Sequence, residues 1–259
     1  MAQQFKQAMV MAAGLGSRLL PLTRDVPKPL LPIKDDGTTC LDLVLDRLHR
    51  QKMDRIIVNA YHLAGAIETF VRHRYPNVIM SREPEPLETG GGFIHALPHF
   101  ERDAPVLVVS SDTYLEGDAV DQLGSDMLAN FNPQTEDMLL AVSAKTNGIA
   151  FTGTGDYELT GTRLDYRPNG VSAPYVFIGH RVVMPTFMQI CAERLYPEKG
   201  ACFSFKDCFD IAEANGRLTG RRFDGIWCDL STVDTLNALR AHKLRLPHLV
   251  YSPSPDLIR

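Results

Sequence analysis

Short apolar runs alternate with longer stretches of helical periodicity through the first half of the chain. The short runs predict buried strands at residues 8–12, 55–59, 78–80, 105–110 and 138–143. Apolar side chains recur at spacings of three and four over residues 41–51, which predicts a helix, and the pattern predicts further helices at 64–75 and 91–97. Strands that alternate with helices in this order favour a parallel sheet with right-handed crossovers.

The pattern changes after about residue 150, where short polar strands are separated by glycines. Residues 152–166 predict antiparallel hairpins, followed by a return strand at 175–178 and helices at 204–215 and 230–244. No linker rich in proline, glycine or serine divides the chain, so we expect a single domain.

Composition and charge narrow the classes of function. The chain has 259 residues, of which 44% are hydrophobic and 22% charged, as is typical of a globular protein with a full core. Its net charge of −4 argues against general nucleic-acid binding. Five cysteines without a C-x-x-C pair argue against a disulfide framework or zinc site and favour a reducing cytosol. No window holds 18 consecutive apolar residues, so we expect no membrane span and no membrane partner.

The strongest chemical signal lies in residues 9–33, which read MVMAAGLGSRLLPLTRDVPKPLLPI. The first strand leads into Gly14 and Gly16, where the backbone can approach a ligand closely and present N–H groups to phosphate oxygens. Arg18 and Lys28 would add positive charge for a polyphosphate. Two familiar phosphate motifs are absent from the sequence, because Leu19 replaces the third glycine of the dinucleotide fingerprint and no G-K-[ST] run occurs.

This segment resembles the signature of the sugar-1-phosphate nucleotidyltransferases, roughly G-x-G-[ST]-R-L-x-P-L-T and, after a short gap, P-K-P-L-[LV]-P. The resemblance continues more weakly to about residue 243. Within the family, the short length and the run Glu88-Thr89-Gly90-Gly91-Gly92 are most similar to the N-acetylmuramate-1-phosphate uridylyltransferases of peptidoglycan recycling. The resemblance implies an α/β, Rossmann-like fold with a mainly parallel mixed sheet, helices on both faces and a small antiparallel sugar-binding lobe.

The activity implied by the resemblance joins an NTP to a sugar 1-phosphate and releases pyrophosphate. The single domain, residues 1–259, would then comprise a nucleotide-binding part at about 1–145, a sugar-binding lobe at about 146–225 and a C-terminal helix at about 230–244. Two anions must meet in this reaction, so Mg²⁺ is the expected cofactor. The expected partners are these two small molecules, and we expect a cytoplasmic monomer or small homo-oligomer.

Carboxylates and cations at matching positions are the candidate catalytic residues. Asp112 follows the apolar strand at 105–110, and open α/β sheets place their ligands at such strand ends. Asp229 belongs to a W-x-D pattern that matches the second metal-binding aspartate of the family. The resemblance implies that both aspartates hold the metal and that Arg18, Lys28 and Asp112 take part in catalysis.

The nucleotide-binding residues implied by the resemblance lie in the N-terminal loop and near residue 88. They are Ala13, Gly14, Gly16, Ser17, Arg18, Glu83, Glu88 and Thr89. Glu83 stands where the family commonly reads the base, and an ionised carboxylate accepts the ring N–H of uracil, thymine or guanine but disfavours cytosine and adenine. The sugar phosphate would contact Tyr166 and Arg167, at the place of a common E-K-P triplet, and Gly179 in the next strand.

Two other functions stay open from the sequence. Glu83 cannot separate uracil from guanine, so mannose-1-phosphate guanylyltransferase, or another hexose-1-phosphate nucleotidyltransferase, is an alternative to uridylyl transfer onto N-acetylmuramate 1-phosphate. The other is a catalytically weak regulatory protein that binds nucleotide sugars, because Ser111 and Ser231 stand where relatives commonly have glycine. Retention of Arg18 and Lys28, together with both aspartates, argues for an enzyme.

Overall fold

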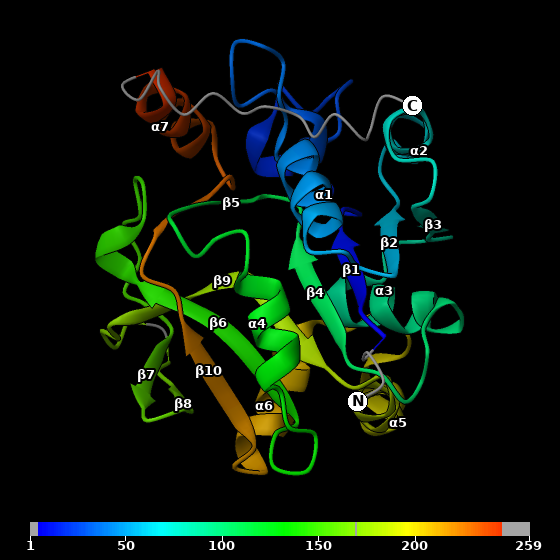
Figure 1. Ribbon diagram of the computed structural model, residues 1–259, viewed down its shortest axis with the longest axis vertical. Helices are drawn as coiled ribbons and strands as arrows, with labels where there is room; N and C mark the ends of the chain where they lie inside the picture. The colour runs from blue at the N-terminus through cyan, green and yellow to red at the C-terminus, as the bar shows by residue number, and fades with distance from the viewer. Residues whose placement is uncertain (1–4, 169, 245–259) are drawn as a thin grey trace.

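The computed structural model describes residues 5–168 and 170–244. The strands in these residues are β1 (Gln7–Met11), β2 (Arg55–Ala60), β3 (Ile79–Arg82), β4 (Val106–Ser110), β5 (Thr113–Glu116), β6 (Met138–Ala144), β7 (Tyr157–Thr160), β8 (Arg163–Tyr166), β9 (Tyr175–Val183), β10 (Leu218–Arg222) and β11 (Ile226–Asp229). Within the same residues, nine strands form one sheet in the order β3-β2-β1-β4-β9-β6-β10-β8-β7, and β11-β5 form a separate pair (Figure 1).

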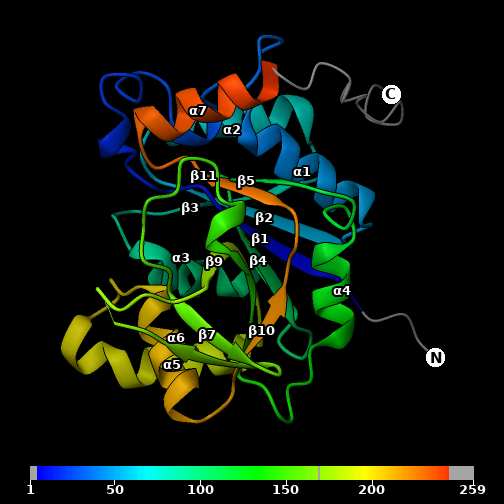
Figure 2. The same cartoon turned by 90° about the vertical axis from the view of Figure 1, so that its left-hand side faces the viewer.

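Helices cover both faces of the large sheet (Figures 1 and 2). They are α1 (Cys40–Arg50), α2 (Ala64–Arg74), α3 (Glu88–Ala96), α4 (Leu123–Asn130), α5 (Pro185–Lys199), α6 (Phe205–Ala214) and α7 (Val233–Leu244). Short 3₁₀ turns lie at Ser17–Leu19, Lys28–Leu30, Leu97–His99 and Lys145–Asn147. One face of the sheet packs against α1, α2 and α4, and the other packs against α3, α5 and α6. No helix in the described residues is long and apolar enough to cross a membrane.

The central strands are buried on both faces. Met9 of β1 packs in the core beside α3, whereas its neighbour Val10 packs in the core beside α1. Val108 of β4 likewise packs in the core beside α3 and Val109 in the core beside α1, because successive side chains of a strand point to opposite faces. Burial on both faces explains why these strands read as continuous apolar runs rather than as alternating patterns.

The expected mixed sheet with helices on both faces and a small antiparallel part is confirmed. The ladders β1–β2, β1–β4, β2–β3 and β6–β10 are parallel. Strand β9 lies between β4 and β6 and runs antiparallel to both, so it joins the N-terminal strands to the rest of the sheet. The expected hairpin is β7–β8, which turns at Gly161 with a positive φ of 62°.

A third apolar cluster holds the N-terminal loop in place. It gathers Leu19 and Ile33 from the loop, Tyr114 from β5, and Leu236 and Leu239 from α7. Figure 2 shows α7 above the β5–β11 pair, next to the loop. The loop that carries the sequence signature is therefore fixed by segments from the far end of the chain.

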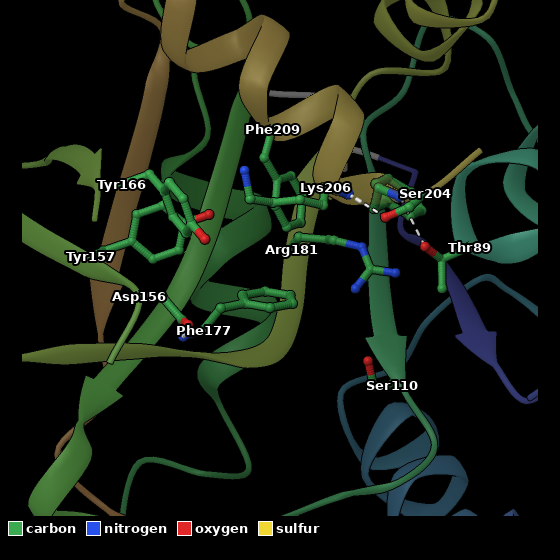
Figure 3. Close-up of a pocket in the computed structure, with 11 residues that line it drawn as sticks. Thr89, Ser110, Asp156, Tyr157, Tyr166, Phe177, Arg181, Ser204, Lys206 and Phe209 are labelled. Atoms are coloured by element: carbon green, nitrogen blue, oxygen red, sulfur yellow. Dashed lines mark hydrogen bonds between the residues drawn. The ribbon is translucent and has the colours of Figure 1, made fainter. Parts of the chain in front are cut away.

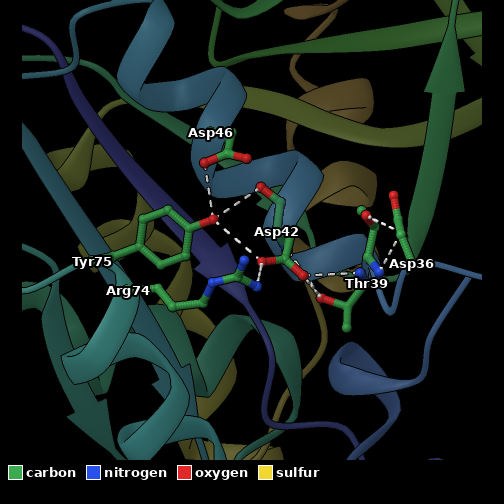
Figure 4. A network of polar contacts seen from close by, with 7 residues as sticks. Asp36, Thr39, Asp42, Asp46, Arg74 and Tyr75 are labelled. Atoms are coloured by element: carbon green, nitrogen blue, oxygen red, sulfur yellow. Dashed lines mark hydrogen bonds and ion pairs between the residues drawn. The ribbon is translucent and has the colours of Figure 1, made fainter. Parts of the chain in front are cut away.

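Helices α1 and α2 are joined by a partly buried polar network (Figure 4). Asp42 caps the start of α1, where it accepts from the Thr39 N–H at 2.9 Å, and it also pairs with Arg74 at the end of α2. The Tyr75 hydroxyl donates to Asp46 Oδ1 at 2.9 Å. Burial raises the pKa of Asp46, and this hydrogen bond opposes that rise. The network fixes the helix pair that covers the outer edge of the sheet.

Candidate active site

A cavity of about 570 Å³ opens at the carboxyl ends of the parallel strands β1, β2 and β4. Its wall contains the N-terminal loop from Ala13 to Arg18, together with Lys28. Asn59 near the end of β2, Glu83 after β3 and Asp112 after β4 complete the wall on the sheet side. Open α/β sheets bind their ligands at this edge, and we call this space the first cavity.

The two glycines of the N-terminal loop serve different purposes. Gly16 has a φ of 66°, and a Cβ added there would lie 3.0 Å from Cγ2 of Thr23 and 3.2 Å from Cβ of Lys28. The Thr23 hydroxyl donates to the Gly16 carbonyl at 2.8 Å, which fixes this turn. A Cβ added at Gly14 would meet no atom of the described residues within 4 Å, so the open space there is available to a ligand. The Arg18 side chain, also in the wall, is exposed.

The two candidate metal-binding aspartates lie on neighbouring backbone segments. Strands β5 and β11 pair antiparallel with Asp229 opposite Thr113, and the Leu230 N–H donates to the Asp112 carbonyl at 3.0 Å. Loss of surrounding water and then the charge of Asp112 raise the pKa of Asp229, although Asp229 keeps exposed surface. Asp112 lines the first cavity, whereas Asp229 does not.

Lys28 is bound directly to Asp112. The Nζ atom of Lys28 lies 2.6 Å from Asp112 Oδ2. Pro27 and Pro29 flank this lysine, and its 3₁₀ turn begins at the residue itself, so the backbone that presents the ammonium is stiff. A cation from the N-terminal loop and a carboxylate from the end of β4 therefore share one position in the wall.

The two aspartates form a donor set suited to a hard divalent cation. Mg²⁺ prefers one or two carboxylates and takes its remaining ligands from phosphate oxygens and water. No group of three or more histidine, cysteine, aspartate or glutamate side chains able to hold a metal occurs in the described residues. A pair of carboxylates beside a cavity large enough for a nucleotide fits magnesium bound together with substrate phosphates.

The serines that replace family glycines engage the protein rather than obstruct the cavity. Ser111 is buried, and its hydroxyl donates to the Met11 carbonyl at 2.6 Å, which ties the end of β4 to β1. Ser231 lines the first cavity, and its hydrogen bond to Asp229 lowers the pKa of that carboxyl. Both serines therefore support the segments that carry the aspartates.

Glu83 is built into the opposite wall of the first cavity. It is only 4% exposed, and its Oε1 accepts from Nδ2 of Asn59 at 2.6 Å. Oδ1 of Asn59 accepts the Ala12 N–H at 2.7 Å, so the amide is held in one orientation. Burial raises the pKa of Glu83, and hydrogen bonds from Asn59 and the Leu87 backbone oppose that rise.

The glycines after Thr89 let helix α3 pack closely. A Cβ at Gly91 would lie 2.0 Å from the Ala201 carbonyl oxygen, and one at Gly92 would lie 2.4 Å from Oε1 of Glu83. Helix α3 therefore sits directly against the segment at Ala201 and against Glu83. This packing brings Glu88 and Thr89 into the wall of the first cavity.

A second cavity, of about 420 Å³, adjoins the first (Figure 3). The two share Thr89 and Ser110 in their walls. Oγ1 of Thr89 accepts the Phe205 N–H at 2.9 Å, which connects α3 to α6 at the junction. The second cavity lies between β9, the β7–β8 hairpin and α6, and its wall also contains Asp156, Tyr157, Tyr166, Phe177, Arg181, Lys206 and Phe209.

The candidate sugar-binding residues are placed differently. Tyr166 lines the second cavity, with the Lys206 ammonium 4.0 Å from the centre of its ring. Arg167 is exposed, and neither it nor Gly179 is in the wall of either cavity. Gly179 has a φ of 78°, and a Cβ there would lie 2.7 Å from Oγ1 of Thr113. It therefore permits the close approach of β9 to the segment after Asp112.

Sequence reasoning missed several residues of the second cavity. Asp156 and Lys206 carried no motif, although Lys206 falls within the helix expected at 204–215. Arg181 lies beyond the expected end of the return strand at residue 178, whereas β9 continues to Val183. A strand that continued to Val183 would have placed Arg181 on the same face of the sheet as Val183, whose side chain packs in the core beside α3. This alternation is the signal that could have identified Arg181 as a buried residue.

Comparisons with known proteins agree with this geometry. The family model "Nucleotidyl transferase" matches residues 7–244. The chain is 34% identical to an N-acetylmuramate alpha-1-phosphate uridylyltransferase of Caulobacter vibrioides, over 88% of this chain and 92% of that protein. A protein of the same name from Neisseria meningitidis serogroup B is 27% identical over 91% of this chain and 97% of its own length. The solved UDP-glucose pyrophosphorylase of Acinetobacter baumannii superposes with a TM-score of 0.72 at 18% identity, covering 95% of this chain and 96% of that one.

Proposed function

Because the chain belongs to the nucleotidyl transferase family and is a sugar-1-phosphate nucleotidyltransferase, we propose that it transfers the uridylyl group of UTP to N-acetylmuramate 1-phosphate. The names of the Caulobacter and Neisseria relatives support this pair of substrates. The structural observation that carries the proposal is the junction of two cavities at Thr89 of α3 and Ser110, the last residue of the strand β4 that leads to Asp112. A nucleotide in one cavity and a sugar in the other would meet beside this aspartate.

The first cavity is proposed for UTP and the second for the sugar. The nucleotide would contact Ala13, Gly14, Gly16, Ser17, Arg18, Glu83, Glu88 and Thr89, all of which line the first cavity. Tyr166 lines the second cavity and would contact the sugar. Contacts of the sugar phosphate with Arg167 and Gly179 stay predictions, since neither residue lines a cavity.

The proposed reaction is an attack of one phosphate on another. A phosphate oxygen of the sugar 1-phosphate attacks the α-phosphorus of UTP, the bond to the bridging oxygen of the β-phosphate breaks, and pyrophosphate leaves. Arg18 and Lys28 line the first cavity, where they would offset the charge of the triphosphate and of the leaving pyrophosphate. The ion pair with Asp112 holds Lys28 in this wall, where the remaining N–H groups of its ammonium could donate to phosphate oxygens.

Asp112 and Asp229 are the residues proposed to hold Mg²⁺. Burial and then the charge of Asp112 raise the pKa of Asp229, and a bound cation would offset both effects. When bound there, the ion would stabilise negative charge on the reacting phosphates as a Lewis acid. The ammonium of Lys28 supplies part of this positive charge from the protein itself.

The proposed base reader is Glu83. Its Oε1 is occupied by Asn59, which leaves acceptor capacity on the carboxylate for the N3–H of uracil. The N1–H of guanine offers the same donor, so GTP is the second candidate nucleotide on the chemistry of Glu83. A weak regulatory role is set aside, because the matched relatives are transferases and Ser111 and Ser231 support the aspartates.

A cytoplasmic setting is part of the proposal. All five cysteines are free thiols, and four of them are buried, which supports a reducing compartment. The proposed partners are the two substrates alone, with the protein a monomer or small homo-oligomer. Size-exclusion chromatography with light scattering distinguishes these two states.

The experiment that tests the function is a matrix of NTPs against sugar 1-phosphates with Mg²⁺, scored by pyrophosphate release. We expect the highest kcat/KM for UTP with N-acetylmuramate 1-phosphate. A clear preference for GTP, or for an unsubstituted hexose 1-phosphate, would replace the proposed substrates while nucleotidyl transfer stands. Release of pyrophosphate in no combination would contradict the proposal as a whole.

A further inference from the structure

Arg181 is a buried cation in the wall of the second cavity that the proposed reaction leaves unused. It lies in β9 opposite Val108 of β4 and Leu140 of β6, and it is only 3% exposed. Its guanidinium carbon is 4.0 Å from the ring centre of Phe205. The ring centre of Phe177, which lies beside Arg181 in Figure 3, is 5.7 Å away. These rings attract the positive charge, but they offer no oxygen atom to its N–H groups.

The hydrogen-bonding capacity of Arg181 is not met within the protein. Its Nε and Nη2 atoms are buried and have no hydrogen-bond partner in the described residues. Burial lowers the pKa of Arg181 to about 9, so the side chain still carries its charge at neutral pH. A buried cation without an anion destabilises a fold, and such groups are typical of ligand sites.

The other charged groups of the second cavity are already engaged. The Lys206 ammonium pairs with Asp210 on the next turn of α6. Oδ2 of Asp156 accepts the Phe177 N–H at 2.9 Å. Among the charged side chains of this wall in the described residues, Arg181 is therefore the one whose buried polar atoms lack a hydrogen bond.

Arg181 lies on the sugar side of the junction. It lines the second cavity but not the first, whose wall contains the cations Arg18 and Lys28. Ser110 lines both cavities and lies two residues nearer to Asp112 along β4 than the register position of Arg181. The charge of Asp112 partly opposes the fall in the pKa of Arg181, but Asp112 forms its ion pair with Lys28. The reacting phosphate near Asp112 has Arg18 and Lys28 beside it, which leaves Arg181 for a different anion carried by the sugar.

We propose that Arg181 binds the carboxylate of the lactyl ether on N-acetylmuramate 1-phosphate and so determines the choice of sugar. This inference rests on the proposed function, which assigns the second cavity to the sugar. The planar guanidinium can donate two parallel N–H bonds to a carboxylate, and the apolar walls of Phe177 and Phe205 exclude the water that would otherwise weaken them. N-acetylglucosamine 1-phosphate has the same phosphate but no carboxylate, so it leaves this charge unpaired.

The test compares these two sugar phosphates in the Arg181→Met variant, which keeps the length and apolar bulk of the side chain. We expect kcat/KM for N-acetylmuramate 1-phosphate to fall by about 100-fold, while that for N-acetylglucosamine 1-phosphate stays within about threefold. Arg181→Lys should recover part of the loss, since it restores the charge without the planar pair of donors. The control is Arg163→Met, an exposed arginine of the adjoining hairpin, which should change neither value.

Thermal unfolding separates this role from a structural one. If Arg181 is an unpaired buried charge, the Arg181→Met variant should have a higher Tm than the wild type. If Arg181 instead stabilises the core, the variant should have a lower Tm. An equal loss for both sugars would overturn the proposal: with Tm kept or raised, it would assign Arg181 to the shared phosphate, and with a lowered Tm, to the core.

Direct binding keeps the inference separate from the proposed function. If pyrophosphate release fails for every substrate pair, the proposed function falls, and calorimetric titration of N-acetylmuramate 1-phosphate still tests Arg181. Binding to the wild type that weakens at least tenfold in Arg181→Met, with no such change for N-acetylglucosamine 1-phosphate, supports the carboxylate site. Equal binding by both proteins overturns it.

Discussion

The ammonium of Lys28 lies 2.6 Å from Oδ2 of Asp112, although the two residues are 84 positions apart in the chain. The contact joins the N-terminal loop to the end of β4 at the wall of the first cavity. It places a cation and a metal-binding candidate at the same point before any substrate is present. Substitution of Lys28 or Asp112 can therefore affect catalysis, the attachment of the N-terminal loop, or both, and the measurements must separate the two effects.

Substitution Asp112→Asn should lower turnover by about 100-fold or more, because the amide cannot supply the charge that stabilises a cation beside the reacting phosphates. The measurement is steady-state pyrophosphate release as a function of Mg²⁺ concentration. Asp118→Asn is the matched control, since Asp118 is exposed in the loop after β5 and lines neither cavity. Full activity of both Asp112→Asn and Asp229→Asn would remove the metal assignment.

Arg18→Lys should impair the reaction although it keeps the charge, because the ammonium lacks the planar set of donors that matches two phosphate oxygens. Arg18 is exposed in the wall of the first cavity, so the substitution should leave the melting temperature unchanged. In Arg18→Ala, a fall in kcat would indicate stabilisation of the transition state. A rise in the KM for UTP with unchanged kcat would instead show uniform nucleotide binding.

The sequence was sufficient for the parts of the fold and site that depend on local pattern. The buried strands around Val10 and Val108 read as continuous apolar runs because both faces are covered. Asp112 could be predicted to lie near a ligand because it follows the strand that contains Val108, and open α/β sheets bind ligands at the carboxyl ends of their strands. The signature loop could be recognised because its glycines, proline and basic residues lie close together in sequence.

The second cavity could not be predicted, because its charged side chains come from distant segments whose pairing no local pattern reveals. The return strand was expected to end at residue 178, which left Arg181 outside it, and a buried arginine is rare and costly. In the structure Arg181 continues β9 between β4 and β6. The contact of Asn59 with Glu83 was equally hidden, because it depends on how β2 and β3 pair.

The affinity for UTP should depend on pH through Glu83. The ionised carboxylate is the form that accepts the uracil N–H, and burial raises the pKa of this group above that of an ordinary glutamate. As pH falls, the KM for UTP should therefore rise at a higher pH than an ordinary glutamate would give. The amide of Glu83→Gln keeps an acceptor oxygen but does not titrate, so its KM should lose this dependence.

The matched control for this pH profile is Glu85→Gln. Glu85 is exposed in the same loop and lines neither cavity, so its profile should follow the wild type. An unchanged profile in Glu83→Gln would mean that another group titrates, and Glu83 would lose its assignment as the base reader.

Two glycine substitutions should separate packing from ligand binding. Gly91→Ala places a Cβ 2.0 Å from the Ala201 carbonyl oxygen, so α3 must shift, and we expect the free energy of unfolding to fall by about 1–3 kcal/mol. Gly14→Ala adds a Cβ with no described atom within 4 Å, so stability should change by less than about 0.5 kcal/mol. Because Gly14 lines the first cavity, the same methyl group should raise the KM for UTP. Urea unfolding and steady-state kinetics measure the two effects, and a Gly14→Ala enzyme with unaltered UTP kinetics would place the triphosphate away from this loop.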